Sequence, residues 1–561
     1  MSLRHALACT LAFCAHAFAA AQVQEPRTAC DVLLRARRVH GVAGDEGGAF
    51  VAWSAGKILA AGPSAGARAF EAARTIELDR AMVTPGLVDA HGHLLGLGDL
   101  LEEVNLVGTT SYAEVIERVV ARARTAPAGT WVVGRGWDQN DWTTKAFPEH
   151  GELSRATPDH PVWLVRVDGH AALANARAMA LASIPERSED PPGGRVLRDA
   201  AGRPTGVFVD RAMRQVGVKV SESARPLAER LLAAQERLLA VGLTGMHDAG
   251  IEPETVAALE ALIAEKRWKI RIYGMWGGRP RRESPSAHPS GLLDLRAVKL
   301  YADGALGSRG AALLADYSDE PGVRGLETMT EDELFAVYLE CLQKGFQACT
   351  HAIGDRGNRN ALQAFDRACR QLELDPENAR ARRFRMEHAQ VVAAEDFARF
   401  AANGWIASMQ PTHCTSDMDW AVERLGAERA QGAYAWRAML TRGVPLAFGS
   451  DFPVEDCDPR LGIFAALTRT HADGTPRGGW FPEQRLEEAE ALSAFTAGAA
   501  RAAFAEERRG KVAIGFDADL SVFDPDPALA EELGAGWLST RARMTIVAGQ
   551  VVYERSSNGQ R

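Results

Sequence analysis

The chain has 561 residues, of which 46% are hydrophobic and 24% charged, and its net charge is −9 at neutral pH. This composition is typical of globular proteins and supplies enough apolar material for a large core. The modest negative charge gives no sign of the basic patch that a nucleic-acid surface needs, so we expect no nucleic-acid partner.

The first 21 residues are typical of a signal peptide. Arg4 precedes an apolar run from Ala6 to Phe18, and the small residues around Ala19 fit an A-x-A cleavage site. The run is shorter than the roughly 20 residues that a membrane-spanning helix needs. We therefore expect a periplasmic or secreted protein without stable membrane association. A disordered or buried N-terminal helix is the alternative interpretation.

Both ends of the remaining chain have the pattern of short strands. Alternating apolar residues and glycine-rich breaks run from Cys30 to Leu78, and segments such as DADLSVFD and ARMTIVAGQVVYE repeat that texture near the C-terminus. The two ends therefore predict one composite β-sandwich domain, made from residues 30–82 and 505–558.

The middle of the chain, residues 83–504, alternates short apolar strands with helical stretches. This order predicts an α/β fold, a (β/α)₈ TIM-like barrel whose chemistry lies at the C-terminal ends of its strands. The eight expected strands are Val83–Ala90, Gly242–Asp248, Lys269–Met275, Ala297–Ala302, Gly345–Thr350, Arg383–Glu387, Gly404–Met409 and Val444–Gly449.

A large insertion separates the first two expected strands. The gap is about 150 residues, far longer than the usual connection between neighbouring elements. We expect residues 98–220 to form a subdomain that covers the active site as a lid or substrate-binding unit.

The strongest local motif is VTPGLVDAHGH, an apolar strand that ends in His91 and His93. Residues two apart on a strand point to the same side, so the two imidazoles are expected to converge. Imidazole nitrogen suits zinc and similar divalent metals. A pair of this kind on its own is often a surface accident, so further ligands are needed to make it a site.

Lys299 lies inside the apolar strand of AVKLYADGALGSR. A buried lysine is costly unless its charge is neutralised or paired. Carboxylation of the amine by CO₂ would give a carbamate that can bridge two metals. The alternative is an ion pair with Asp303, four residues later.

Three more ligand-type residues follow apolar strands. His351 opens HAIGD, His388 lies in MEHAQ, and Asp451 lies in GSDFPVE. Any one of them is more often a hydrogen-bonded core residue, but together with the earlier candidates they mark the ends of five barrel strands. No CxxC pair is present, so a cysteine zinc site is not expected.

The segments VDAHGH, VKLYADGALGSR, HAIGD, MEHAQ and GSDFPVE closely resemble the YtcJ-like branch of the amidohydrolase superfamily (amidohydrolase family 3). That branch includes the N-substituted formamide deformylases. The resemblance covers nearly all of the chain after the signal segment, and no ligand position is missing from it.

The resemblance implies a centre of one or two divalent metal ions, with zinc favoured. The implied ligands are His91, His93 and Asp451 for the first ion, His351 and His388 for the second, and carboxylated Lys299 between them. Metal-activated hydroxide would attack the scissile carbonyl, while Asp451 would take a proton and return it to the leaving group. With Lys299 unmodified, a mononuclear site remains possible through His91, His93, His351 and Asp451.

The insertion and the loops add weaker candidates. Within the resemblance, Asp168 and His170 would reach over the site, with His170 binding substrate or stabilising charge. A simple turn capped by Asp168 is the alternative. Trp137 would line an apolar pocket or fill the core of the insertion. Arg309 would bind a substrate carboxylate or pair with Asp303, and Glu387 would orient its neighbour His388.

The resulting hypothesis is a metal-dependent hydrolase that cleaves an amide, N-formyl or N-acyl C–N bond of a small molecule. A lactonase, esterase or carbamate hydrolase with the same centre is the alternative, because pocket and leaving group are not visible in the sequence. A non-catalytic binding protein is disfavoured because all six ligand positions are kept. We expect a small-molecule substrate and no nucleic-acid partner, and a homodimer would be unsurprising.

Overall fold

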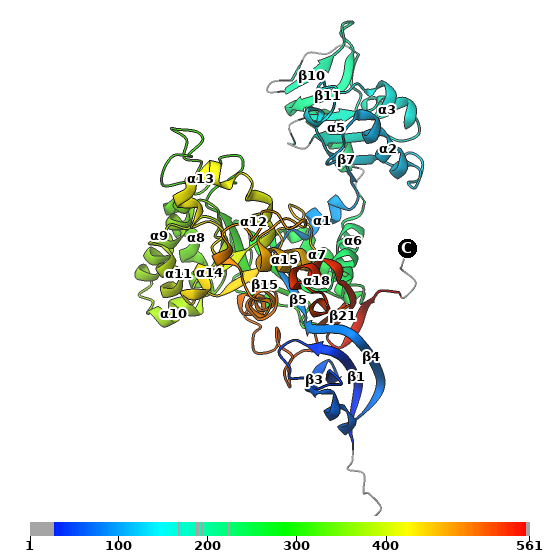
Figure 1. Ribbon diagram of the computed structural model, residues 1–561. Coiled ribbons are helices and arrows are strands. Elements are labelled where there is room, and N and C mark those ends of the chain that lie inside the picture. The colour runs from blue at the N-terminus through cyan, green and yellow to red at the C-terminus, as the bar shows by residue number, and fades with distance from the viewer. Residues whose placement is uncertain are drawn as a thin grey trace, which may run out of the picture.

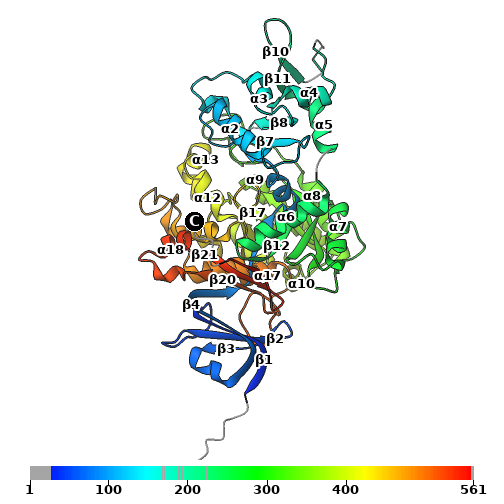
Figure 2. The same cartoon turned by 90° about the vertical axis from the view of Figure 1, so that its right-hand side faces the viewer.

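The computed structural model describes residues 27–556, apart from 167–168, 170, 187–189, 192–193 and 223–224. The predicted signal peptide, together with Asp168 and His170, therefore lies outside the described residues. Three sheets organise the rest: a seven-stranded sheet, a barrel sheet and a six-stranded sheet in the insertion. In Figures 1 and 2 the barrel lies between the other two units.

Strands from both ends of the chain form the seven-stranded sheet. Its order is β22-β21-β20-β4-β1-β2-β3. The strands are β1 Thr28–Val39, β2 Ala49–Ser54, β3 Lys57–Pro63, β4 Phe70–Pro85, β20 Leu520–Asp524, β21 Arg541–Val547 and β22 Gln550–Glu554. The long β4 pairs with β1 and with β20, so the expected sandwich is one continuous sheet. Leu34 and Val51 share a core with Val522, which joins the two chain ends.

The prediction of a (β/α)₈ barrel is confirmed. Eight strands follow the order β19-β18-β17-β16-β15-β13-β12-β5, with each adjacent pair parallel. They are β5 Leu87–Gly92, β12 Leu243–Ile251, β13 Arg271–Gly277, β15 Leu293–Tyr301, β16 Gln347–Ala352, β17 Arg385–His388, β18 Ile406–Met409 and β19 Leu446–Phe448. Short β14, Ser286–Ala287, pairs antiparallel with β15.

The first and last barrel strands meet through the turn after β19. The Asp451 amide donates to the His91 carbonyl at 2.7 Å. A Cβ on Gly449 would lie 2.5 Å from the backbone nitrogen of His91, so a side chain at that position would block this approach. The buried carboxylate of Asp89 accepts from the Ser450 hydroxyl at 2.7 Å and from the His91 amide at 3.0 Å. The closure therefore places residue 451 beside the end of β5.

Helices follow and surround the barrel strands. They are α6 Leu227–Ala240, α7 Pro253–Ala264, α8 Glu331–Lys344, α9 Asp355–Gln371, α10 Pro376–Ala381, α11 Phe397–Asn403, α12 Pro411–Asp417, α13 Ala421–Ala430, α14 Trp436–Thr441, α15 Pro459–Thr468, α16 Glu488–Ser493, α17 Ala499–Ala502 and α18 Leu533–Ser539. In α8, Thr330 and Glu333 form a capping box, and Gly345 ends the helix at a φ of 78°. Within the described residues, no helix is both long and apolar enough to cross a membrane.

The insertion begins after α1, Leu94–Leu100, and has its own sheet of order β10-β11-β9-β8-β7-β6. Its elements are β6 Val104–Asn105, α2 Tyr112–Ala123, β7 Val132–Trp137, α3 His150–Ala156, β8 Val162–Arg166, β9 Ala171–Ala174, α4 Ala176–Leu181, β10 Gly194–Arg198, β11 Pro204–Asp210 and α5 Arg214–Glu222. Figure 1 shows it beyond α1, as a unit with a sheet of its own.

Candidate metal centre

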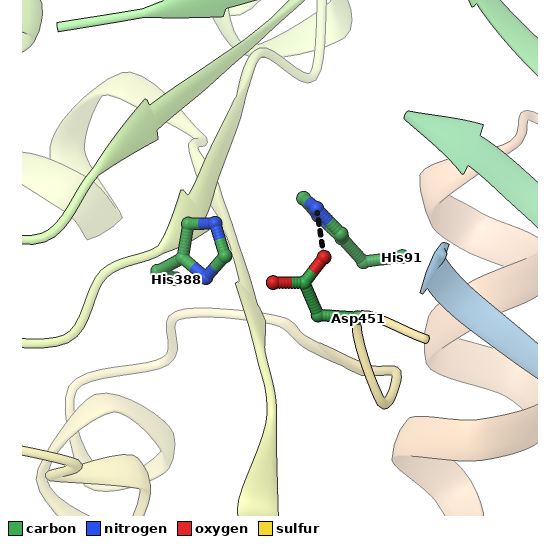
Figure 3. Close-up of side chains that lie close together, drawn as sticks. All are labelled: His91, His388 and Asp451. Carbon is green, nitrogen blue, oxygen red and sulfur yellow. Dashed lines mark ion pairs between the residues drawn. The ribbon is translucent and has the colours of Figure 1, made fainter. Parts of the chain in front are cut away.

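His91, His388 and Asp451 form a compact cluster at the C-terminal ends of the barrel strands. One potential ligand atom from each side chain lies within 4.8 Å of the other two (Figure 3). His91 comes from β5, His388 from β17 and Asp451 from the turn after β19. All three are buried. Barrel closure thus brings together residues that are far apart in the chain.

His93 joins this cluster at the start of α1. Nε2 of His93 lies 3.1 Å from Oδ1 of Asp451, and Nε2 of His91 lies 3.4 Å from the same oxygen. The two imidazole rings meet edge to face with centroids 5.7 Å apart, so they converge as the strand pattern predicts. Between them, a Cβ on Gly92 would lie 2.4 Å from the Phe452 ring, which explains the glycine at this position.

Lys299 lies on β15 and is 1% exposed. Its Nζ is 3.2 Å from Nε2 of His91. Burial lowers the pKa of the amine. The structure does not show the alternative, an ion pair between Lys299 and Asp303. The Asp303 carboxylate instead accepts from the backbone amides of Ala312, Ile353 and Gly354, at 2.9, 2.9 and 2.7 Å.

His351 and His388 are neighbours at the ends of β16 and β17, with ring centroids 4.5 Å apart. Burial lowers the pKa of His351 to about 3 and holds the pKa of His388 well below its usual value. Both rings are therefore neutral near pH 7 and keep a nitrogen lone pair for a cation. Nδ1 of His388 lies 2.9 Å from Oε1 of Gln410, which orients the ring.

Glu387 orients His91 and not its sequence neighbour His388, which corrects our expectation. Its Oε2 lies 2.5 Å from Nδ1 of His91, whereas Gln410 takes the corresponding role at His388. Arg385 forms an ion pair with Glu387 at 2.8 Å, and both side chains are fully buried. Although burial raises the pKa of Glu387, Arg385 and His91 together hold it well below the usual range.

Asp451 carries a negative charge inside this cluster. Although burial raises the pKa of its carboxyl group, the adjacent His91 and His93 hold that pKa well below the usual range. The backbone φ is 60° at Asp451 and 72° at His388. Residues other than glycine seldom adopt this left-handed region, and when they do they often lie at functional sites.

The two other predicted substrate-binding residues that the structure describes lie elsewhere. Trp137 is buried in the core of the insertion, and its Nε1 donates to the carbonyl of Leu164 at 2.8 Å. Its indole therefore fills a core and does not line a pocket at the metal centre. Arg309 pairs with Asp319 at 2.9 Å and with Glu320 at 3.0 Å, so its charge is already balanced, though by neither of the expected partners.

Sequence reasoning missed three residues of the site. Gln410 and His413 follow β18, and Tyr301 ends β15 with its ring 4.9 Å from Nζ of Lys299. A signal for two of them was present, because they come just after the predicted strand that ends at Met409. Residues at the C-terminal end of a barrel strand are candidates for function.

The donors in this cluster fit a divalent cation. Nε2 of His413, a buried atom 3.8 Å from Oδ2 of Asp451, has no hydrogen-bond partner among the described residues. Buried polar atoms in native proteins are nearly always satisfied, so such a group indicates something that binds there. Several imidazoles with one carboxylate are the donor set of zinc and similar ions.

Comparison with known proteins identifies the family. Residues 74–553 match the model of the amidohydrolase family. The chain belongs to the amidohydrolase family. The putative amidohydrolase YtcJ of Bacillus subtilis is 32% identical over 86% of this chain and 90% of its own length. The predicted membership of the YtcJ-like branch is confirmed.

Two further proteins are similar to this amidohydrolase over most of their length. The N-substituted formamide deformylase of Arthrobacter pascens is 26% identical over 90% of this chain and 95% of its own length. An uncharacterised metal-dependent hydrolase of Pyrococcus furiosus shares the fold with a TM-score of 0.68 and 27% identity, over 89% of this chain and 99% of that one. With a site that fits a divalent metal, the chain is a metal-dependent hydrolase.

Proposed function

We propose that this amidohydrolase cleaves the C–N bond of an amide, N-formyl or N-acyl group in a small molecule. The observation that carries the proposal is the position of Asp451, an ionised carboxylate 3.1 Å from His93 and 3.4 Å from His91. An amine is a poor leaving group unless it is protonated, so C–N hydrolysis needs a group that moves a proton to nitrogen. The similarity to a formamide deformylase over most of both chains supports the same class of bond.

The metal would be held by residues at the ends of five barrel strands. We assign His91, His93 and Asp451 to one ion, His351 and His388 to a second, and Lys299 to the position between them. We propose zinc, because the ligands are mostly imidazoles. A bound divalent ion supplies a water whose pKa falls from about 15.7 to about 7, and a Lewis acid for the acyl oxygen.

Asp451 moves the proton in this proposal. Its carboxylate accepts a proton from the attacking water as the C–O bond forms. It then donates that proton to the leaving nitrogen as the C–N bond breaks, so that an acid and an amine are released. Glu387 and Gln410 contribute by fixing the rings of His91 and His388.

Lys299 is suited to carboxylation. Its buried amine has a lowered pKa, and a neutral amine can attack CO₂. Nζ of Lys299 would form a bond to the carbon of CO₂ and lose one proton. The resulting carbamate anion would lie next to His91. Should the lysine stay unmodified, the proposed centre is mononuclear, with His91, His93, His351 and Asp451 as ligands.

Matched substrates test the bond class. We would load the purified protein with zinc and measure kcat/KM for N-butylformamide and N-butylacetamide beside butyl formate, butyl acetate, butyl carbamate and a simple lactone. The proposal predicts that the amides are hydrolysed and that Asp451→Asn removes this activity. Hydrolysis of the esters, the carbamate or the lactone without any amide turnover would contradict C–N specificity and favour the alternative hydrolases.

A further inference from the structure

His413 is placed beside the proposed proton carrier. It lies on α12, which starts directly after β18. Its ring is parallel to that of His388, with centroids 5.9 Å apart and an interplanar angle of 7°. Nε2 of His413 is 3.8 Å from Oδ2 of Asp451, and the side chain is 13% exposed. The residue is therefore part of the wall around the metal centre.

The Nε2 atom of His413 is buried and has no hydrogen-bond partner among the described residues. The separation of 3.8 Å from Asp451 is longer than a hydrogen bond. It is also short for a bridging water, because two ordinary bonds at a near-tetrahedral water oxygen span about 4.5 Å. The Nε2 atom is therefore free to bind a group that lies next to Asp451.

The two oxygens of Asp451 face different neighbours. Oδ1 lies 3.4 Å from His91 and 3.1 Å from His93, whereas Oδ2 faces His413. The negative charge on Asp451 favours the tautomer of His413 that carries its hydrogen on Nε2. The imidazole therefore presents a donor to the site, and a donor needs an acceptor. In an amide the acceptor is the acyl oxygen, because the nitrogen lone pair is delocalised.

We propose that His413 is a catalytic residue whose Nε2–H donates a hydrogen bond to the acyl oxygen of the substrate. This inference rests on the proposed hydrolysis of an acyl group. The bond holds the acyl group next to Asp451 and strengthens as negative charge develops on that oxygen. Its effect therefore belongs mainly to kcat and not to KM.

Two replacements of His413 test the proposal in the zinc-loaded enzyme. His413→Leu removes the donor and should lower kcat by roughly 10²- to 10³-fold with KM changed less than about threefold. His413→Gln keeps an N–H donor, so its kcat should be at least about tenfold higher than that of His413→Leu. As a matched control, His471→Leu should leave kcat unchanged, because the Nε2 atom of His471 already pairs with Asp419 at 3.1 Å.

Binding measurements give a readout that does not depend on turnover. Calorimetry with methylphosphonate, a tetrahedral anion, and with acetate, a planar one, should show about a hundredfold weaker methylphosphonate binding in His413→Leu and unchanged acetate binding. Zinc content should equal that of the wild type. Loss of zinc, an unchanged kcat, or equal weakening for both anions would overturn the role of His413.

The two proposals fail in different ways. If the wild-type protein hydrolyses only esters or lactones, the proposed C–N specificity is wrong, and the His413 variants are then measured on the ester, which has the same acyl oxygen. If it hydrolyses amides and His413→Leu matches the wild type in kcat and in methylphosphonate binding, the C–N proposal stands and the role of His413 is wrong.

Discussion

Glu387 and His91 are joined by a short contact of 2.5 Å between Oε2 and Nδ1, across 296 positions of the chain. Since the ionised carboxylate can only accept, the hydrogen lies on Nδ1. Nε2 of His91 is then directed toward Lys299 and Asp451. This arrangement depends on β5 and β17 meeting inside one closed barrel, and it leads to the predictions that follow.

Gln410 should control metal affinity through His388. Replacing it with Met keeps the volume and removes the acceptor of the 2.9 Å bond to Nδ1. We expect the zinc dissociation constant to rise roughly 10- to 100-fold, as measured by competition with a chelator. Gln390→Met is the matched control, because this buried glutamine bonds Tyr434 instead. An equal effect of both variants would show a general packing defect.

Asp451→Asn should remove turnover and keep the fold. The amide cannot accept the proton that the ionised carboxylate takes, so kcat should fall by about 10²- to 10⁴-fold. Circular dichroism and Tm would verify the fold. The control is Asp456→Asn, because Asp456 pairs with Arg237 near the surface. An active Asp451→Asn enzyme would exclude this residue as the base.

Lys299 should carry a CO₂-sized mass if the centre is binuclear. Native mass spectrometry should detect this mass and acid should remove it, with about two zinc ions per chain. Lys299→Ala should lose the added mass and part of the metal, and a small carboxylic acid should restore some activity. Lys344→Ala, on the outside of the barrel, is the control. Full metal content in Lys299→Ala would contradict the bridging role.

We expect Asp248 to make the unfolding free energy of the metal-free protein depend on pH. Burial raises the pKa of its carboxyl group to about 7, above an unfolded value of about 3.9. The folded state therefore holds a proton that the unfolded state releases between these values. The stabilisation is fully present below about pH 4 and is lost as the pH rises through 7.

The comparison that checks this is the Tm of wild type minus that of Asp248→Asn, measured from pH 5 to 8 after chelation. The difference should decrease steadily across the range, since asparagine does not titrate. A difference that stays constant or grows with pH would show that the carboxyl group of Asp248 is ionised in the folded protein throughout.

Trp137 should matter for stability and not for substrate recognition. Trp137→Ala would leave a cavity in the core of the insertion and an unpaired carbonyl at Leu164. We expect a loss of about 3–5 kcal/mol in the unfolding free energy of that subdomain. The loss should appear as an early transition in hydrogen exchange of β7 and β8, while zinc content stays normal. An altered substrate preference with unchanged stability would show that Trp137 takes part in substrate recognition instead.

The barrel could be read from the sequence because local patterns specify it. Eight apolar strands alternate with helices, and the residues at their C-terminal ends included His91, Lys299 and Asp451. Parallel strands place those ends at one face of the barrel, so spatial convergence follows from connectivity alone. The same rule, applied to the strand that ends at Met409, would have added Gln410 and His413.

Tertiary structure decided which partner each side chain has. Position in the chain suggested that Glu387 serves His388 and left a pair of Asp303 with Lys299 as an alternative, but Glu387 meets His91 and Asp303 binds backbone amides. Trp137 is a core residue for the same reason. The sequence by itself determined the fold and the ligand-type residues, through periodicity and strand order. Contacts between side chains depend on barrel closure and on packing between distant segments, which local periodicity does not encode.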